Sequence, residues 1–183
     1  HTWLRRQRQM CIRDRRRSMA IEIRFTPAQR KAIMDEAQRR QTVNERDGRK
    51  GRNGGAERGQ KALFWHQLGC AGEYAVALML NCVDELYQDG VPVRGSVDLP
   101  GWIDVKTRSK HHYDLLVQKD EDPTKTLVLV TCQPNTPTKI HGWIKAKDAM
   151  KPEYWKEWVP GRGCYSFPQS KLNHYEANDS HPS

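Results

Sequence analysis

The clearest helical pattern in the chain lies at residues 61–83 (KALFWHQLGCAGEYAVALMLNCV). Its apolar residues recur with a period close to 3.6, which predicts a long and largely buried helix. Gly69 and Gly72 lie three residues apart and would let another element approach closely. Glu73 has apolar neighbours on both sides, which favours a buried carboxylate over an exposed one. The apolar positions of this pattern are Leu63, Phe64, Leu68, Ala71, Ala75, Leu78, Met79 and Cys82.

A second helix is predicted upstream. Thr26-Pro27 is typical of a helix start, with an N-cap residue followed by proline at the first helical position. We expect this helix to continue to about residue 43, with Ile33, Met34 and Ala37 on one side. Residues 44–60 contain five glycines and no large apolar side chain, so they are predicted to form a flexible basic linker or loop.

The chain downstream of residue 84 has the shorter apolar runs of a sheet. Residues 127–132 (LVLVTC) are almost all apolar or β-branched, as in a central strand. Further strands are predicted at residues 96–99, 102–108, 113–118 and 140–144, with strand-like material at 87–93, a charged turn at 120–125 and a short helix from 146. A helix followed by a run of strands and then mixed elements indicates an α/β or α+β fold.

The charge of the chain is unevenly distributed. The formal net charge is +9, from 31 Lys and Arg against 22 Asp and Glu. Residues 1–18 carry +6, residues 19–60 carry +4, and residues 61–183 carry −1. The basic excess suggests a polyanionic partner such as nucleic acid, but it lies wholly in the first third of the chain.

Residues 1–18 show neither helical nor strand periodicity. The string MCIRDR resembles translated sequencing adaptor, and Met19 is a plausible initiator. We therefore expect a disordered or non-native leader, the alternative being a basic arm that contacts phosphates. The rest divides into a helix and linker at 19–60, a main domain at 61–175 and a polar tail at 176–183.

Several classes of protein are excluded or disfavoured. No apolar run approaches the ~18–20 residues of a membrane span, and the N-terminus lacks the apolar stretch of a secretory signal. The five cysteines are odd in number and show no C-x-x-C spacing, which indicates reduced thiols in a cytoplasm. The spacing of Cys132, Cys164 and His174 does not support a zinc site.

The chemistry of the chain concentrates in residues 96–108 (SVDLPGWIDVKTR). Asp104 and Lys106 lie two apart on a predicted strand and so face the same side, while Trp102, Ile103 and Val105 suit the core. A hairpin through Pro100-Gly101 would bring Asp98 close to Asp104. Two carboxylates at ~4 Å repel by about 4 kcal/mol at an effective dielectric near 20, and a divalent cation removes that repulsion. The alternative interpretations are that Asp98 stabilises the turn, and that Asp104 and Lys106 are solvated residues on an outer face of the sheet.

Asp98, Asp104-Val105-Lys106 and the upstream Glu73 together resemble the motif of the PD-(D/E)xK nuclease superfamily. The GEYAVA and VDLPGWIDVKTR segments are also similar to small nuclease-like proteins of phages. The resemblance covers roughly residues 61–175. It implies a restriction-endonuclease-like core, a mixed sheet flanked by helices, with an N-terminal helical extension. Val97 replaces the proline of the motif, and the spacing from Asp98 to Asp104 is short.

By this resemblance, Glu73, Asp98 and Asp104 would bind Mg²⁺ or Mn²⁺, and Lys106 would support the attacking water. The implied activity is hydrolysis of phosphodiester bonds in DNA, in the bacterial cytoplasm for a phage-encoded protein. Many members act as dimers, so the resemblance leaves open whether this chain forms a homodimer. A non-catalytic nucleic-acid-binding or phage accessory protein with the same fold is the alternative, and an enzyme acting on another phosphorylated substrate is a third reading.

Basic side chains near this motif and in the N-terminal third are the candidate contacts to the DNA backbone. These are Arg108, Lys110, Arg39, Arg40, Arg49, Lys50 and Arg52. Thr107, His111 and His112 are weaker candidates, with surface or loop roles as the alternative. Trp143, Trp155 and Trp158 are expected to pack in or at the rim of the core rather than to stack on bases.

Overall fold

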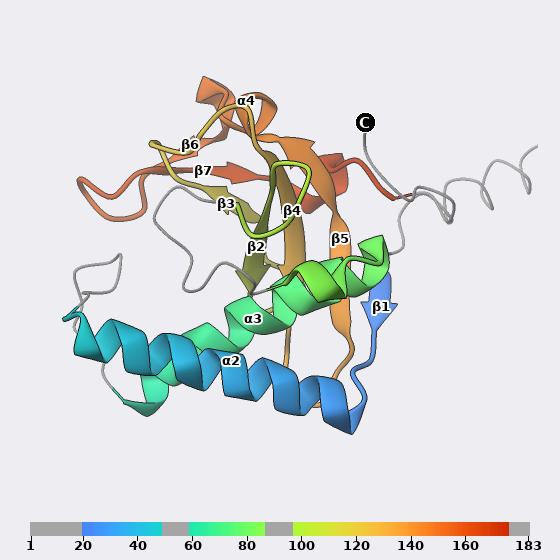
Figure 1. Cartoon of the computed structure of the whole chain (residues 1–183). Helices are drawn as coiled ribbons and strands as arrows, with labels where there is room; N and C mark the ends of the chain where they lie inside the picture. The colour runs from blue at the N-terminus through green and yellow to red at the C-terminus, as the bar shows by residue number, and fades with distance from the viewer. Residues whose placement is uncertain (1–19, 49–58, 87–96, 176–183) are drawn as a thin grey trace, which may run out of the picture.

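A computed structural model describes residues 20–48, 59–86 and 97–175 of the chain (Figure 1). The predicted leader, most of the glycine-rich linker with Arg49, Lys50 and Arg52, the strand-like residues 87–93 and the polar tail lie outside these residues. The described chain has an α+β fold with two sheets. None of its helices has the length and apolarity needed to cross a membrane.

Two long helices pack side by side (Figure 1). Helix α2 (Pro27–Arg46) confirms the predicted start, because Thr26 and Gln29 form a reciprocal capping box. The Gln29 amide donates to Thr26 Oγ1 at 3.3 Å, and the Thr26 amide donates to Gln29 Oε1 at 2.8 Å. Helix α3 (Gln60–Leu80) confirms the 3.6-residue pattern and ends at Asn81, whose φ of 56° is left-handed.

The first sheet has the strand order β1-β5-β4-β2. Strand β2 pairs with β4 in parallel, whereas β4–β5 and β5–β1 are antiparallel, so the sheet is mixed as predicted. Every residue of β4 is buried, which confirms the prediction of a central strand. Its strands are β1 (Ile21–Ile23), β2 (Ile103–Arg108), β4 (Thr126–Thr131) and β5 (Thr138–Lys145).

A second, antiparallel sheet has the order β3-β7-β6. Of its three strands, only β3 was predicted from the sequence. Strands β6 and β7 were not predicted, and neither was β1 of the first sheet. The predicted strand at 96–99 is reduced to a single bridge between Leu99 and Ile103. The second sheet consists of β3 (Leu115–Val117), β6 (Trp155–Lys156) and β7 (Cys164–Phe167), and helix α4 (Ala146–Ala149) lies beside it with the 3₁₀ turns η2 (Pro152–Tyr154) and η3 (Gln169–Lys171).

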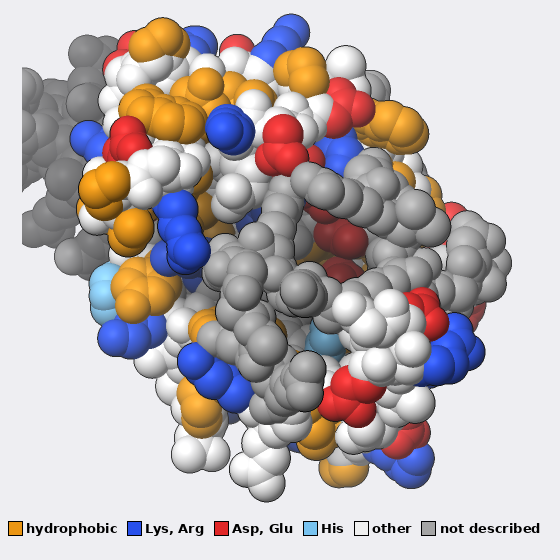
Figure 2. Space-filling view, turned by 90° about the vertical axis from the view of Figure 1, so that its left-hand side faces the viewer, with side chains coloured by type: hydrophobic (Ala, Val, Ile, Leu, Met, Phe, Trp, Pro, Cys, Tyr) orange, Lys and Arg blue, Asp and Glu red, His pale blue; other side chains and the backbone are white. Residues whose placement is uncertain are grey.

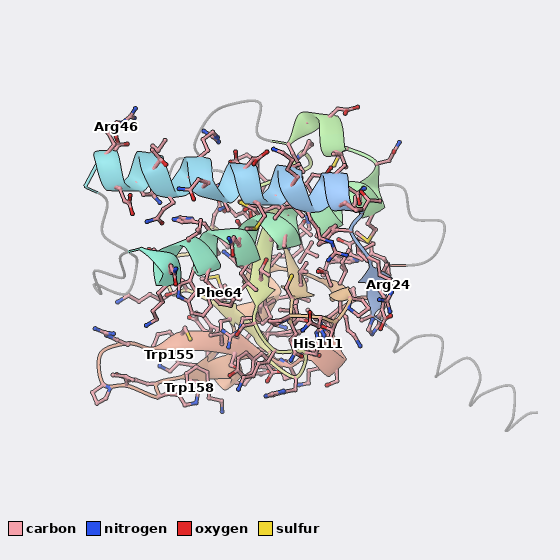
Figure 3. The ribbon with its side chains drawn as sticks, turned by 90° about the horizontal axis from the view of Figure 1, so that it is seen from below. Arg24, Arg46, Phe64, His111, Trp155 and Trp158 are labelled. Atoms are coloured by element: carbon pink, nitrogen blue, oxygen red, sulfur yellow. The ribbon has the colours of Figure 1, made fainter. Side chains whose placement is uncertain are left out.

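The two faces of β4 belong to different parts of the core. Val128 and Val130 pack with α3, and the 3₁₀ turn η1 (Val83–Glu85) extends this side. Leu127 and Leu129 pack with the second sheet. Ile33 and Ala37 of α2 pack on the outer side of α3. Figure 3 shows α2, α3 and the β6–β7 strands one after another in this order. Helix α3 packs on the first sheet with one side and on α2 with the other.

Candidate functional site

The candidate site lies at β2, which is an edge strand of the first sheet among the described strands and follows a tight turn. The Asp98 and Leu99 amides donate to the Ile103 carbonyl at 3.0 and 3.1 Å. Gly101 has a φ of 76°, a conformation that glycine adopts without steric cost. The β2 edge is the left-hand edge of this sheet in Figure 1, the side that Figure 2 turns to the reader. Acidic side chains are visible on that face (Figure 2).

The turn brings Asp98 onto β2, as the sequence predicted. Asp98 Oδ2 accepts a hydrogen bond from the Val105 amide at 2.7 Å. The pKa of Asp98 is raised well above its usual range, first by burial and then by the charges of Glu73 and Asp104, with a further contribution from a hydrogen bond to Asp104. The three predicted acids are therefore close enough to influence one another, and Asp104 does not point away from Asp98.

Glu73 is buried on α3 and is held by a cation from α2. Arg40 donates from Nη1 to Glu73 Oε1 at 2.8 Å and from Nη2 to Glu73 Oε2 at 2.6 Å. The same guanidinium donates from Nε to Glu36 Oε1 at 2.8 Å. Burial alone would lower the pKa of Arg40, but the two carboxylates outweigh it and raise that pKa. The carboxylate that the sequence singled out is thus already in a bidentate ion pair.

Lys106 lies between two acids on the side of β2 that faces the second sheet. Its Nζ forms an ion pair with Asp104 Oδ2 and a 2.6 Å hydrogen bond to Glu121 Oε2. The other oxygen of Glu121 is 3.2 Å from Lys125 Nζ, which in turn is 3.9 Å from Asp104 Oδ2. We call Asp104, Lys106, Glu121 and Lys125 the four-charge ring.

The charges of the ring shift the protonation of its members. Burial lowers the pKa of Lys106, but the charges and hydrogen bonds of Asp104 and Glu121 exceed this effect and raise it. Burial raises the pKa of Glu121, whereas Lys106 and Lys125 lower it, with a net decrease. Both groups are therefore held in their charged forms at neutral pH.

Glu121 and Lys125 were not predicted as site residues from the sequence, which indicated only a charged turn at 120–125. Glu121, Asp120 and Asp122 form an acidic run of a kind that is usually solvated. Only the spacing of four between Glu121 and Lys125 hinted at a pair. The pairing with Lys106 is a tertiary contact that no local pattern contains.

The back of β2 is tightly packed on α3. A Cβ atom at Gly72 would lie 1.9 Å from Thr107 Oγ1, so this position needs glycine. The predicted close approach at the Gly69–Gly72 pair is therefore correct for Gly72. Thr107 Oγ1 is buried without a hydrogen-bond partner among the described residues. Thr107 is thus turned toward the helix rather than outward to a phosphate.

The three acids offer the oxygen donors that a hard divalent cation prefers, but their side chains are not arranged as a metal site. Asp104 Oδ2 is buried, and its contacts within the described residues are the ion pairs with Lys106 and Lys125. Oxygen donors of this kind suit Mg²⁺ or Mn²⁺. Across the described parts of the chain, however, no three His, Cys, Asp or Glu side chains are grouped so as to hold a metal ion. Arg40 and Lys106 instead neutralise Glu73 and Asp104.

The basic residues proposed to contact nucleic acid differ in accessibility. Arg40 is turned into the α2–α3 interface, and Arg39 is paired with Glu36 at 2.7 Å but is partly exposed. Arg108 is half-buried with its guanidinium 4.7 Å from the centre of the Tyr113 ring, and burial lowers its pKa. Lys110 lies over the same ring at 5.6 Å and is exposed.

Three aromatic residues lie elsewhere than the sequence suggested. Trp102 is not in the core: it is 51% exposed, has a left-handed φ of 62°, and donates from Nε1 to Thr124 Oγ1 at 2.8 Å. Trp158 is 63% exposed on the β6–β7 loop, and Trp155 is also exposed, with its ring against Tyr165. Figure 3 shows both on the same side of the molecule as Phe64 of α3. Trp143 is half-buried beside the α3-facing core.

The two histidine candidates, His111 and His112, have different surroundings. His111 Nδ1 is 2.6 Å from Thr131 Oγ1, and the same hydroxyl is 2.7 Å from His141 Nε2. His112 is exposed and stacks edge-on against Tyr113. His111 is thus engaged with β4 and β5 rather than with the acids of β2.

Comparisons of the chain with protein-family models, with curated protein sequences and with solved structures each find no match. The interpretation of the site therefore depends on its own geometry and chemistry.

Proposed function

We propose that the chain is a metal-dependent nuclease that hydrolyses phosphodiester bonds in DNA, with a restriction-endonuclease-like core. The observation that carries the proposal is that Glu73 of α3 and Asp104 of β2 both lie close enough to Asp98 for their charges to raise its pKa, with Lys106 paired to Asp104 on the same strand. A cluster of mutually repelling, partly buried acids beside a lysine is costly for stability, and such arrangements are concentrated at functional sites.

Each residue has a distinct role in the proposal. Asp98 and Asp104 would hold the cation, and Glu73 would join them when Arg40 releases it. A bound Mg²⁺ or Mn²⁺ would lower the pKa of a water molecule and neutralise phosphate charge. Lys106, placed beside Asp104, would orient the attacking water and stabilise the negative charge that builds up on the phosphate.

DNA is the proposed substrate because the surroundings of the site suit a polyanion. Arg108 and Lys110 extend from the end of β2, the strand that carries Asp104 and Lys106. Lysine and arginine side chains also appear at several places on the face shown in Figure 2. These side chains supply the phosphate contacts that position a nucleic acid without reading its sequence.

The test is cleavage of plasmid, linear duplex, single-stranded and branched DNA with Mg²⁺ or Mn²⁺. We expect Asp104→Asn and Lys106→Met to lower cleavage by at least about 10²-fold, as when a group that stabilises transition-state charge is removed. Asp35→Asn on α2 is the matched control, because Asp35 forms only an exposed pair with Lys31. Thermal unfolding of each variant shows whether it is folded. A wild-type chain that cleaves none of these substrates with either cation would show that the proposal is wrong.

One observation favours a non-catalytic alternative. Arg40 and the four-charge ring neutralise Glu73 and Asp104 within the fold. A nucleic-acid-binding protein that retained the acids only as structural ion pairs would show the same contacts. It would bind DNA without cleaving it, and calorimetric titration with Mn²⁺ would detect no binding that depends on Asp98 and Asp104.

A further inference from the structure

The four-charge ring extends the candidate site beyond the residues of the motif. Lys106 Nζ contacts Asp104 on one side and Glu121 Oε2 on the other, at 2.6 Å. Glu121 Oε1 contacts Lys125 Nζ at 3.2 Å, and Lys125 Nζ returns to Asp104 Oδ2 at 3.9 Å. Acids and bases alternate around the ring, so each cation has two anionic neighbours and the ring has no net charge.

Glu121 and Lys125 are the more deeply enclosed half of the ring. Their side chains are 6% and 4% exposed, although the segment between β3 and β4 has the composition of a surface turn. A buried ion is costly unless it is paired and hydrogen-bonded. Lys125 is too enclosed to touch a substrate as large as a nucleic acid. Its contacts indicate that it acts on Glu121, and through Glu121 on Lys106.

The backbone fixes both residues independently of their side chains. The Glu121 amide donates to the Gln118 carbonyl at 3.2 Å, and the Lys125 amide donates to the Asp122 carbonyl at 3.3 Å. The Lys125 carbonyl accepts from the Ala146 amide of α4 at 2.9 Å. The next residue, Thr126, begins β4 beside the start of β2. The turn is thus anchored to α4 and to the first sheet.

We propose that Glu121 and Lys125 are positioning residues for Lys106. Glu121 holds the Lys106 ammonium beside Asp104, and Lys125 holds the Glu121 carboxylate in the orientation that this contact needs. Without Glu121, the flexible side chain of Lys106 has one fixed contact instead of two. The consequence for catalysis rests on the proposed nuclease function, whereas the placement of Lys106 does not.

The placement is tested by hydrogen exchange of lysine ammonium protons in ¹⁵N-lysine-labelled protein, at one fixed pH. An enclosed, ion-paired ammonium exchanges slowly enough to be observed, and Lys106→Met assigns its signal. The main variant is Glu121→Gln with Lys125→Met, which removes one charge of each sign and keeps the ring neutral. We expect this variant to lose the Lys106 signal. Asp122→Asn, in the same turn but bonded to Thr124, is the control and should keep it.

The consequence is tested by cleavage kinetics. We expect kcat to fall about 10²-fold in the double variant, because a displacement of about 1 Å can have that effect. KM should stay within about threefold, since neither residue contacts the substrate. The single variant Lys125→Arg, in which Glu121 is kept, retains the cation and should have most of the wild-type kcat. A general loss of structure in the double variant would instead show as a midpoint of thermal unfolding well below that of the Asp122→Asn control.

The outcomes separate the two proposals. A Lys106 signal that persists in the double variant overturns the positioning role, as does an unchanged kcat in an active enzyme whose Lys106 signal is lost. Loss of the signal in a chain that never cleaves DNA supports the positioning of Lys106 and refutes the nuclease function.

Discussion

At the scale of single residues, the clearest consequence of burial outside the candidate site is the state of His141. Its ring is half-buried on β5, with Nε2 2.7 Å from Thr131 Oγ1. The pKa of His141 is lowered to about 4, first by burial and then by the nearby charges of His111, Lys139 and His174. The ring is therefore neutral in the folded chain at a pH where an unfolded chain would bind a proton.

We predict that this histidine makes folding stability depend on pH. Between about pH 4 and 6.5, the unfolded state binds more protons than the folded state, so stability rises with pH. Each pKa unit corresponds to about 1.36 kcal/mol, and partial exposure reduces the expected rise to ~1–2 kcal/mol. His141→Asn should remove most of it, as measured by urea unfolding across this range. His112→Asn, an exposed change, should leave the rise intact, and equal slopes in all three proteins would contradict the prediction.

The residues of the site were predictable only where a local pattern carries them. Asp104 and Lys106 share a strand, Asp98 precedes a Pro-Gly turn, and Glu73 interrupts an apolar helix. Arg40, Glu121 and Lys125 become part of the site through contacts that are distant in sequence. From the sequence, Glu121 and Lys125 were expected on a solvated surface, whereas both are buried.

At the scale of elements, the contact between α3 and β2 determines how the helix places Glu73. Gly72 has no side chain where Thr107 of β2 lies, and Glu73 is the next residue of the helix. Gly69, one turn earlier, has more room, because a Cβ atom there would meet only Glu73 Oε1 at 3.9 Å. The two glycines therefore provide a matched pair for mutation.

We predict opposite effects at these two positions. Gly72→Ala should destabilise the chain by about 1–3 kcal/mol, since the new methyl group cannot fit beside Thr107. Gly69→Ala should be neutral or stabilise it by up to about 1 kcal/mol, because alanine has the higher helix propensity. Adding Thr107→Ala to Gly72→Ala makes room and should recover part of the loss. Denaturant unfolding measures the stability of these three variants and of the wild type. A Gly72→Ala chain as stable as wild type would show that α3 can move away from β2.

Periodicity identified the elements that are long or fully buried and missed the short ones. Helices α2 and α3 and strand β4 have repeated apolar positions or a continuous apolar run. Strands β6 and β7 have two and four residues, and their pairing places Trp155 and Lys156 opposite Tyr165 and Cys164. So few residues show no usable alternation. Trp102 was misplaced because the turn before β2 gives it a left-handed conformation that directs it away from the core.

At the scale of the whole molecule, α2 is attached to the rest of the fold by charge as well as by apolar contacts. Arg40 joins Glu36 of its own helix to Glu73 of α3. The sequence predicted a helical extension, whereas α2 shares the apolar cluster of Ile33, Ala37 and Cys70 with α3. Removing Arg40 would take this cation from Glu73, whereas Glu36 would keep its pair with Arg39.

We predict that Arg40→Met destabilises the chain by about 3–5 kcal/mol, the range expected when one partner of a buried ion pair is removed. Lys31→Met, which breaks an exposed pair with Asp35 on the same helix, should cost less than about 1 kcal/mol. Adding Glu73→Gln to Arg40→Met should recover part of the loss. The measurement is denaturant unfolding, and equal effects of the two single changes would mean that α2 docks without the help of Arg40.

The pairing of β1 with β5 has a consequence for the order in which the chain assembles. Ile21 and Ile140 are partners across two strands, although they are 119 residues apart in the sequence. Contacts between residues so far apart in sequence form late, and they slow folding relative to local contacts. During synthesis, β1 leaves the ribosome long before its partner exists, and until then its edge is unprotected. The first strand of the described chain to be made is therefore among the last to take its place in the sheet.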